Sequence, residues 1–109
     1  MSAKHNDLVR LIRLYLSEVG AMSVPVDTPG LLYTRDGIPA KFGIKGTLDI
    51  AATVKGRAVW IDAKIGRDKL KPAQQKFVDA QTRAGGLAFA AWSVADVSDR
   101  LKNEGLIDG

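Results

Sequence analysis

The segment from Gly46 to Lys64, GTLDIAATVKGRAVWIDAK, constrains the fold more than any other part of the sequence. Two runs within it, residues 48–54 and 57–65, are rich in Ile, Val, Ala, Thr and Trp, as β-strands are. Lys55 and Gly56 separate the two runs, and glycine supplies the positive φ that a two-residue hairpin turn needs. The segment therefore predicts a β-hairpin.

The hairpin turn sets which residues face one another. If the loop holds only two residues, counting back along both strands places Asp49 opposite Asp62, with their Cβ atoms roughly 5 Å apart. Lys64 lies two residues beyond Asp62 and shares its face. Opposed like charges destabilise a hairpin, and a divalent cation bound by carboxylate oxygens would offset their repulsion. A longer loop with a glycine bulge would move Asp62 elsewhere.

Composition limits the class of protein. The chain of 109 residues suits a single domain over residues 1–109, and 46% hydrophobic residues argue against disorder. Its net charge of +4 favours a polyanionic partner, nucleic acid above all, although a merely basic protein fits the charge equally well. Without cysteine, disulfides and cysteine-based zinc sites are excluded. No apolar run suits a signal peptide or a membrane span, so we expect an intracellular protein with no membrane partner.

The remaining elements follow from periodicity and punctuation. Asn6 is the expected N-cap of a first helix that ends near Val19, before Gly20, with the apolar stripe Leu8, Leu11, Ile12, Tyr15, Leu16 and Val19. Residues 31–34 could form a short strand, Pro72 begins a second helix, residues 87–92 form a buried strand, and Ser93 caps a last helix. The order is α-β-β-β-α-β-α, which predicts an α/β fold with a mixed sheet flanked by helices. Trp60 and Trp92 are expected in the core or in an interface rather than as platforms on which bases stack.

Several polar residues could join the acidic patch. Gln74 falls on the inward stripe of the second helix, where it could orient a water or a phosphate, or lie at a solvated rim. Asp7 and Glu18 border the first helix's stripe roughly 16 Å apart, so at most one could reach a compact site, and both read better as solvated helix charges. Candidate DNA-backbone contacts, each equally readable as a solvated loop residue, are Lys41, Lys45, Arg67, Lys69 and Lys71.

Other chemistries fit less well. The sequence has no phosphate-binding loop and no dinucleotide fingerprint, and its one histidine, His5, stands near an N-terminus expected to be mobile. A pair of carboxylates could suggest a glycosidase, but the neighbouring lysine and the basic chain suit phosphodiester chemistry better. In that interpretation Asp49 and Asp62 bind Mg²⁺ or Mn²⁺, a carbonyl near Ala63 adds a ligand, and Lys64 positions water or stabilises phosphate charge.

These segments resemble a known family. Gly46-Thr47-Leu48-Asp49 followed by Asp62-Ala63-Lys64 resembles the PD-(D/E)xK nuclease signature. Downstream, the segment from Leu70 to Gln74, with Phe77 and a Gly-Gly pair after it, resembles the Leu-Ser-x-x-Gln segment of the VRR-NUC branch. The first helix resembles that branch's opening helix, where an acidic residue stands near the position of Asp7. The small size resembles stand-alone phage-type members.

The resemblance implies a restriction-endonuclease-like core and a metal-dependent DNA endonuclease that acts on branched DNA, such as four-way junctions or flaps, as a homodimer in a bacterial or phage-infected cell. It assigns metal-ligand roles to Asp49 and Asp62, the catalytic lysine to Lys64 and an active-site glutamine to Gln74. It leaves Asp7 open as a further ligand. The departures are a first Asp without the usual proline, Asp for Glu at the second acid, and Lys71 in place of a capping Ser or Thr.

Two alternatives stay open from the sequence. The first is a non-catalytic DNA-binding or assembly module on the same fold. The second is an unrelated basic α/β domain in which Asp62 and Lys64 form an ordinary surface ion pair.

Overall fold

The computed structural model describes residues 3–26, 31–33, 35–36, 39–41 and 46–108. Its three helices are α1 (Ala3–Glu18), α2 (Pro72–Arg83) and α3 (Val94–Asn103). The main sheet contains β1 (Met22–Pro25), β4 (Ile50–Val54), β5 (Arg57–Ala63) and β6 (Leu87–Ala91). A separate two-stranded antiparallel sheet contains β2 (Leu31–Tyr33) and β3 (Pro39–Lys41).

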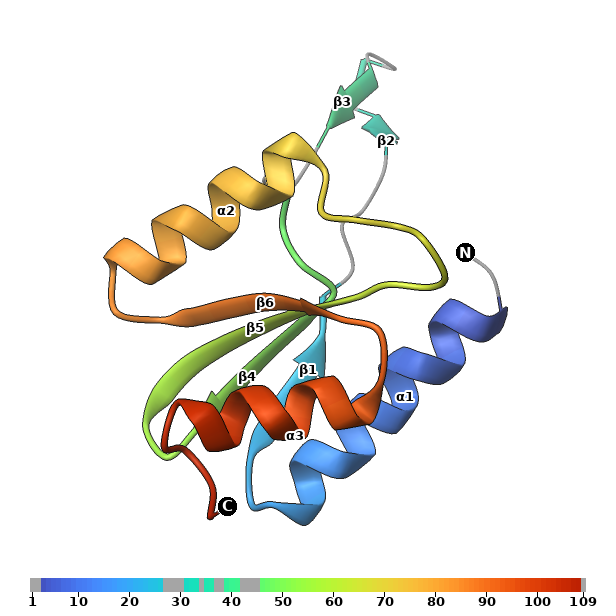
Figure 1. The fold of residues 1–109 in the computed structure, drawn as a ribbon. Helices are drawn as coiled ribbons and strands as arrows, with labels where there is room; N and C mark the ends of the chain where they lie inside the picture. The colour runs from blue at the N-terminus through green and yellow to red at the C-terminus, as the bar shows by residue number, and fades with distance from the viewer. Residues whose placement is uncertain (1–2, 27–30, 34, 37–38, 42–45, 109) are drawn as a thin grey trace.

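The main sheet is mixed and is covered by helices on both faces. Its strand order is β1-β4-β5-β6, in which β5 and β6 are parallel and the other pairs antiparallel. Figure 1 shows α1 and α3 together below the sheet and α2 above it. The crossover from β5 through α2 to β6 is the standard way to join parallel neighbours. The predicted α/β fold with a mixed sheet flanked by helices is confirmed.

The central hairpin has the register expected from the sequence. Ile50 pairs with Ile61, and Val54 pairs with Arg57. The turn residues Lys55 and Gly56 have φ values of 48° and 82°, as a two-residue hairpin turn with positive φ at both positions requires. The register therefore places Asp49 and Asp62 at the same end of the hairpin.

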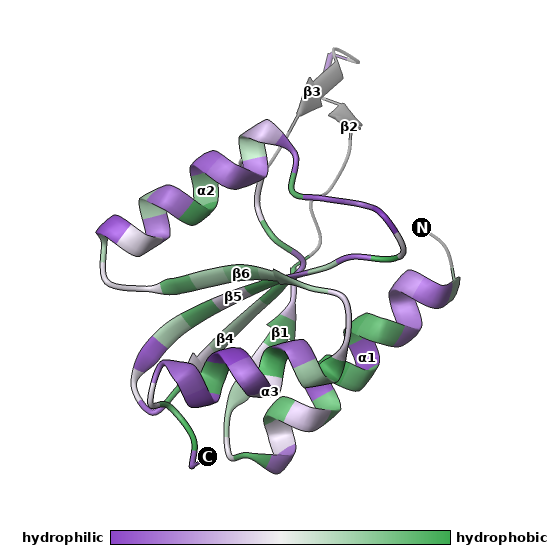
Figure 2. Ribbon diagram, viewed as in Figure 1, coloured by the Kyte–Doolittle hydropathy of each residue, from purple (hydrophilic) through white to green (hydrophobic). Residues whose placement is uncertain are grey.

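Alternation along the strands builds the core on the side of α1 and α3. Every second residue of β4 and β5 is buried on this side, and Leu8, Ile12 and Leu16 of α1 pack against them. Figure 2 shows the central strands mostly as hydrophobic, whereas α2 is mostly hydrophilic. The opposite face of the strands, toward α2, therefore carries the residues that are not part of this core. The buried strand residues of this core are Ile50, Ala52, Val54, Val59, Ile61 and Ala63.

Some sequence expectations were wrong in detail. The first helix begins at Ala3, so Asn6 lies inside it and is no N-cap. Leu11 is 50% exposed, because the buried stripe is narrower than the apolar pattern. The strands β1 and β3 were missed, since each is short and contains a proline. The helix does end before Gly20, whose φ is 83° and whose N–H bonds to the Ser17 carbonyl.

Gly46 brings the chain before β4 close to the start of α2. Its φ is 89°, and a Cβ at this position would collide with the Ala73 carbonyl and the Gln74 nitrogen. Glycine is thus required both for conformation and for close approach. The contact holds the segment that carries Asp49 against the helix that carries Gln74.

We expect Gly46→Ala to destabilise the protein more than Gly56→Ala does. Both glycines have positive φ, which costs an alanine about 1–2 kcal/mol, but the space around Gly56 is open. The clash with α2 should add about 1–3 kcal/mol at Gly46. Urea unfolding of the two variants measures the difference in free energy, and equal losses would contradict the close packing described here.

Candidate active site

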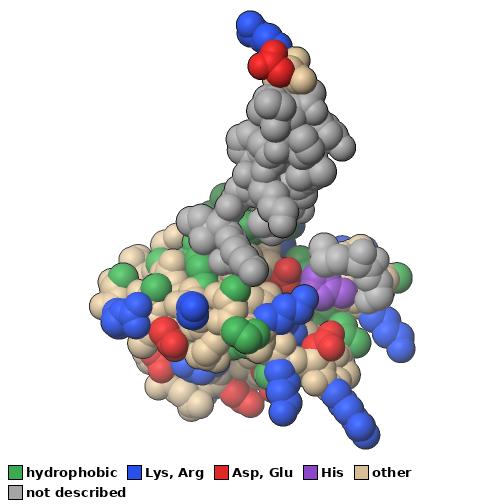
Figure 3. All heavy atoms as spheres, turned by 90° about the horizontal axis from the view of Figure 1, so that it is seen from above, with side chains coloured by type: hydrophobic (Ala, Val, Ile, Leu, Met, Phe, Trp, Pro, Cys, Tyr) green, Lys and Arg blue, Asp and Glu red, His purple; other side chains and the backbone are tan. Residues whose placement is uncertain are grey.

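Polar side chains gather at the edge of the sheet where β5 ends. They surround a hollow of about 290 Å³ between the end of β5, the loop at residues 66–71 and the first turn of α2. Figure 3, which looks onto this side of the molecule, shows the histidine beside acidic side chains, with Lys and Arg side chains around them. The residues that line the hollow are His5, Asp49, Asp62, Ala63, Lys64, Asp68, Lys69, Lys71 and Gln74.

Asp62 and Lys64 form a buried ion pair. Lys64 Nζ lies 2.8 Å from Asp62 Oδ2, and the side chains are 9% and 2% exposed, respectively. Alternation on β5 places both residues on the face toward α2, opposite the hydrophobic core. The pair is therefore no ordinary surface ion pair, and that alternative interpretation is wrong. Burying two charges in this way costs several kcal/mol per ion unless further hydrogen bonds support them.

Gln74 supplies that support from α2. Its Oε1 accepts hydrogen bonds from Lys64 Nζ at 3.0 Å and from the Lys71 backbone N–H at 2.9 Å. Its Nε2 donates to Asp62 Oδ2 at 3.3 Å. Gln74 thus faces the acidic patch, as its position on the stripe indicated, but its amide is bonded to the ion pair itself. Through its bond to the Lys71 N–H, Gln74 also satisfies one free backbone donor at the start of α2.

Asp49 lies just before β4 and is fixed by two donors. Its Oδ2 accepts from the Ala63 backbone N–H at 2.9 Å and lies 3.0 Å from His5 Nε2. The Asp49 carbonyl accepts from the Val26 N–H at 2.7 Å, which continues the pairing of β1 with β4 by one residue. The regular pairing of β4 with β5 ends at Ile50–Ile61, and beyond it the Asp49 carboxylate bonds to the β5 backbone at Ala63.

The environment of Asp62 favours its protonated form. Burial raises the pKa of Asp62 most strongly; the Lys64 hydrogen bond opposes this effect, and the charge of Asp49 adds to it. Its second oxygen, Oδ1, is buried and has no hydrogen-bond donor among the residues that the structure describes. A buried carboxylate oxygen without a partner is costly for a purely structural residue. Such an oxygen, beside a second carboxylate and a hollow, has the position expected of a metal ligand in metal-free protein.

The donor set fits Mg²⁺ or Mn²⁺. Carboxylate and carbonyl oxygens suit these ions, and Mg²⁺ commonly takes one or two carboxylates while keeping several waters. Asp49 and Asp62 supply the carboxylates, and Ala63 also lines the hollow. Across the described ranges, no group of three His, Cys, Asp or Glu side chains is placed to hold a metal. Two carboxylates and a backbone carbonyl suit an ion that keeps several of its waters.

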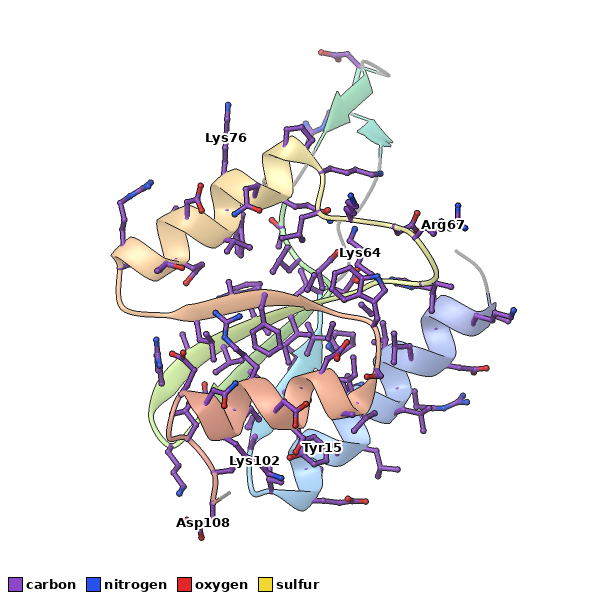
Figure 4. All side chains as sticks on the ribbon, viewed as in Figure 1. Tyr15, Lys64, Arg67, Lys76, Lys102 and Asp108 are labelled. Atoms are coloured by element: carbon purple, nitrogen blue, oxygen red, sulfur yellow. The ribbon has the colours of Figure 1, made fainter. Side chains whose placement is uncertain are left out.

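The other candidate residues differ in whether they reach the hollow. Lys69 and Lys71 line the hollow, and Arg67, which Figure 4 labels, is exposed in the same loop but does not line it. Asp7 is exposed and pairs with Arg10 at 2.8 Å, so the structure does not bring it to the other acids. Lys45 and the side chain of Lys41 lie outside the described residues.

His5 is the site residue that sequence reasoning missed. It was set aside as belonging to a mobile N-terminus, but it lies in the first turns of α1 and its side chain is only 16% exposed. The available signal was spacing, because His5 continues the buried stripe of Leu8, Ile12 and Leu16 by one helical turn. The first helix does reach the patch, through His5 and not through Asp7.

Comparison with known proteins identifies the fold. No protein-family model matches the sequence, and no curated protein matches it. Among solved structures, a VRR_NUC domain is similar to this chain, with a TM-score of 0.64 and 15% identity. The match covers 94% of this chain and 97% of that domain. The chain thus has the fold of a VRR_NUC domain over nearly its whole length.

None of the helices in the part of the chain that the structure describes has the length and apolar character needed to span a bilayer.

We expect Asp62→Asn to change how stability depends on pH in metal-free protein. The folded state raises the pKa of Asp62, so the stability that this residue contributes is fully present below its ordinary pKa of 3.8. It is lost as pH rises through the raised folded value. Urea unfolding from acidic to neutral pH should show wild type losing stability relative to the variant, and a constant difference would refute the assignment.

Proposed function

We propose that this protein is a metal-dependent nuclease that hydrolyses phosphodiester bonds in DNA. One observation carries the proposal: a buried Asp62–Lys64 pair opens on a hollow beside Asp49, and one buried oxygen of Asp62 has no hydrogen-bond donor in the described part of the chain. Such an arrangement is unfavourable as mere scaffolding. The fold of a VRR_NUC domain agrees with it, since the name of that domain refers to nucleases.

Asp49 and Asp62 would hold Mg²⁺ or Mn²⁺, with the Ala63 carbonyl as an additional oxygen ligand. A bound cation supplies Lewis-acid chemistry, drawing electron density from the scissile phosphate and making nearby water more acidic. His5 and the Ala63 N–H fix one oxygen of Asp49, which orients that carboxylate toward the hollow. Asp7, paired with Arg10 in the structure, is not needed for this set.

Lys64 would act on the phosphate. Its ammonium is held between Asp62 and Gln74, so its position beside the hollow is fixed. From there the ammonium stabilises negative charge that develops on the phosphate, or positions the attacking water. Gln74 acts as a positioning residue, since its amide bonds Lys64, Asp62 and the start of α2.

DNA is the substrate that the surroundings favour. The net charge of +4 and the basic loop beside the hollow suit a polyanion, and phosphate contacts from Lys69 and Lys71 would align the backbone with Lys64. Lys41, Lys45 and Arg67 are further proposed backbone contacts. Selectivity for branched DNA, such as four-way junctions or flaps, belongs to the same proposal.

A homodimer is also part of the proposal. The apolar residues Val97 and Leu101 of α3 are buried within the chain, so they are not available to a second subunit. The surface that suits a second subunit better is the sheet edge at β1, where Met22 and Val24 are 67% and 44% exposed.

The second candidate is a DNA-binding or assembly module without catalysis. It is favoured by the engagement of Asp62, Lys64 and Gln74 with one another, which a structural cluster would also show. It does not explain why two carboxylates would face a DNA-binding hollow, where they repel phosphate.

We expect wild-type protein to cleave DNA in Mg²⁺ or Mn²⁺ and Asp49→Ala and Lys64→Ala to lose at least about a hundredfold in rate, as for other electrostatic and general-base groups. The test uses labelled duplex, flap and four-way-junction DNA. Lys76→Ala is the matched control, because it removes one exposed positive charge from the outer side of α2, away from the hollow (Figure 4). It should lose only a few-fold.

Removing Lys64 strands a buried carboxylate, so each variant's fold is checked by circular dichroism and thermal melting, and Asp62→Asn serves as a second variant. Cleavage that persists in all three site variants would refute the site. DNA binding without cleavage in any metal would favour the binding module.

A further inference from the structure

Trp92 lies beside Lys64 with its ring partly exposed. It follows β6 directly and is 43% exposed. In the parallel pairing of β5 and β6, Asp62 stands beside Ala90. The Lys64 N–H donates to the Ala91 carbonyl at 2.9 Å, so this pairing continues one residue past the end of β5. One residue further, the register places Trp92 next to Lys64.

The indole is fixed at one edge. Its Nε1–H donates to the Asp68 carbonyl at 3.1 Å, and its backbone N–H donates to Asp96 Oδ2 at 2.9 Å. Asp68 lines the hollow, so the ring stands at the rim of the site. A large aromatic surface that is already immobilised loses little conformational freedom when it binds a flat partner.

The surroundings indicate which flat partner suits this ring. The loop that Trp92 contacts carries Arg67, Lys69 and Lys71, which are all positively charged and all exposed. Figure 4 labels Lys64 and Arg67 at this same edge. Basic side chains that follow a phosphate backbone, combined with an aromatic face, are the usual means of binding single-stranded nucleic acid. Within a duplex both faces of a base are already stacked, so only an unpaired base could use the ring.

We propose that Trp92 is a stacking platform for an unpaired nucleobase of DNA whose backbone passes over Asp62 and Lys64. This rests on the proposed function, because it takes DNA as the ligand of the hollow. It adds to that function a contact with a base, made by a residue that lies next to Lys64. Trp60 cannot serve the same purpose, since its ring packs edge-to-face on Phe77 at 5.0 Å.

A simpler role would be to anchor the loop through the indole N–H, and two substitutions separate the roles. Trp92→Phe and Trp92→Leu both remove the N–H, but only phenylalanine keeps an aromatic face. Both are made in an Asp62→Asn background, which removes a proposed metal ligand and so prevents cleavage. Fluorescence anisotropy measures binding to a duplex with a single-stranded overhang and to the same duplex with blunt ends. Thermal melts confirm that each variant is folded.

Stacking predicts that the leucine variant loses about 5- to 150-fold in affinity for the overhang duplex, while the phenylalanine variant keeps most of it. Blunt duplex should change less than about threefold for both. In addition, 2-aminopurine at the first unpaired position should be quenched by the parent and the phenylalanine variant, and not by the leucine variant. Equal losses for both variants, or no loss for either, would overturn the proposal.

The same data separate this proposal from the proposed function. If the parent binds both DNAs but neither substitution matters, the stacking role fails while DNA binding stands. If the parent binds no DNA at all, both proposals fail.

Discussion

The structure depends on a buried ion pair between Asp62 and Lys64 at the end of β5, a strand whose alternate residues belong to the hydrophobic core. Both charged side chains are almost wholly buried, and their neighbours Ile61 and Ala63 belong to the hydrophobic core. Breaking such a pair costs about 3–5 kcal/mol, and keeping it is often no better than a hydrophobic substitute. A protein that retains this pair is less stable than it could be. The hollow in front of the pair indicates that the two residues are kept for the chemistry of the site.

The rest of the fold holds this pair in place from three directions. The hairpin register brings Asp49 to the end of β5, and the crossover to β6 starts α2 where Gln74 can bond both partners. The first helix adds His5, which fixes Asp49. Gly46 then allows the segment before β4 to touch the start of α2. Elements that are distant in sequence therefore meet at one sheet edge, where the loop at residues 66–71 adds positive charge.

Much of this could be predicted from the sequence because it depends on local rules. A two-residue turn at Lys55–Gly56 fixes the register, and strand alternation then places Asp49, Asp62 and Lys64 on known faces. Gln74 followed from helical periodicity. The contact that sequence reasoning missed depends on tertiary geometry: His5 was judged by its closeness to the N-terminus, although its side chain lies 3.0 Å from Asp49. Asp7, expected as a solvated helix charge, is exposed and pairs with Arg10. Trp92 was expected in the core or an interface, yet its strand ends one residue earlier and leaves the ring at the rim.

The central claim is that Asp49 and Asp62 form a cation site, and calorimetric titration of metal-free protein with Mn²⁺ tests it most directly. The account predicts one site on wild-type protein, with affinity lowered at least about tenfold by Asp62→Asn and by Asp49→Asn, because each removes a charged ligand. Asp7→Asn, which alters an acid that the structure places outside the hollow, should leave the affinity unchanged. Equal Mn²⁺ affinity in wild type, Asp62→Asn and Asp49→Asn would contradict the account.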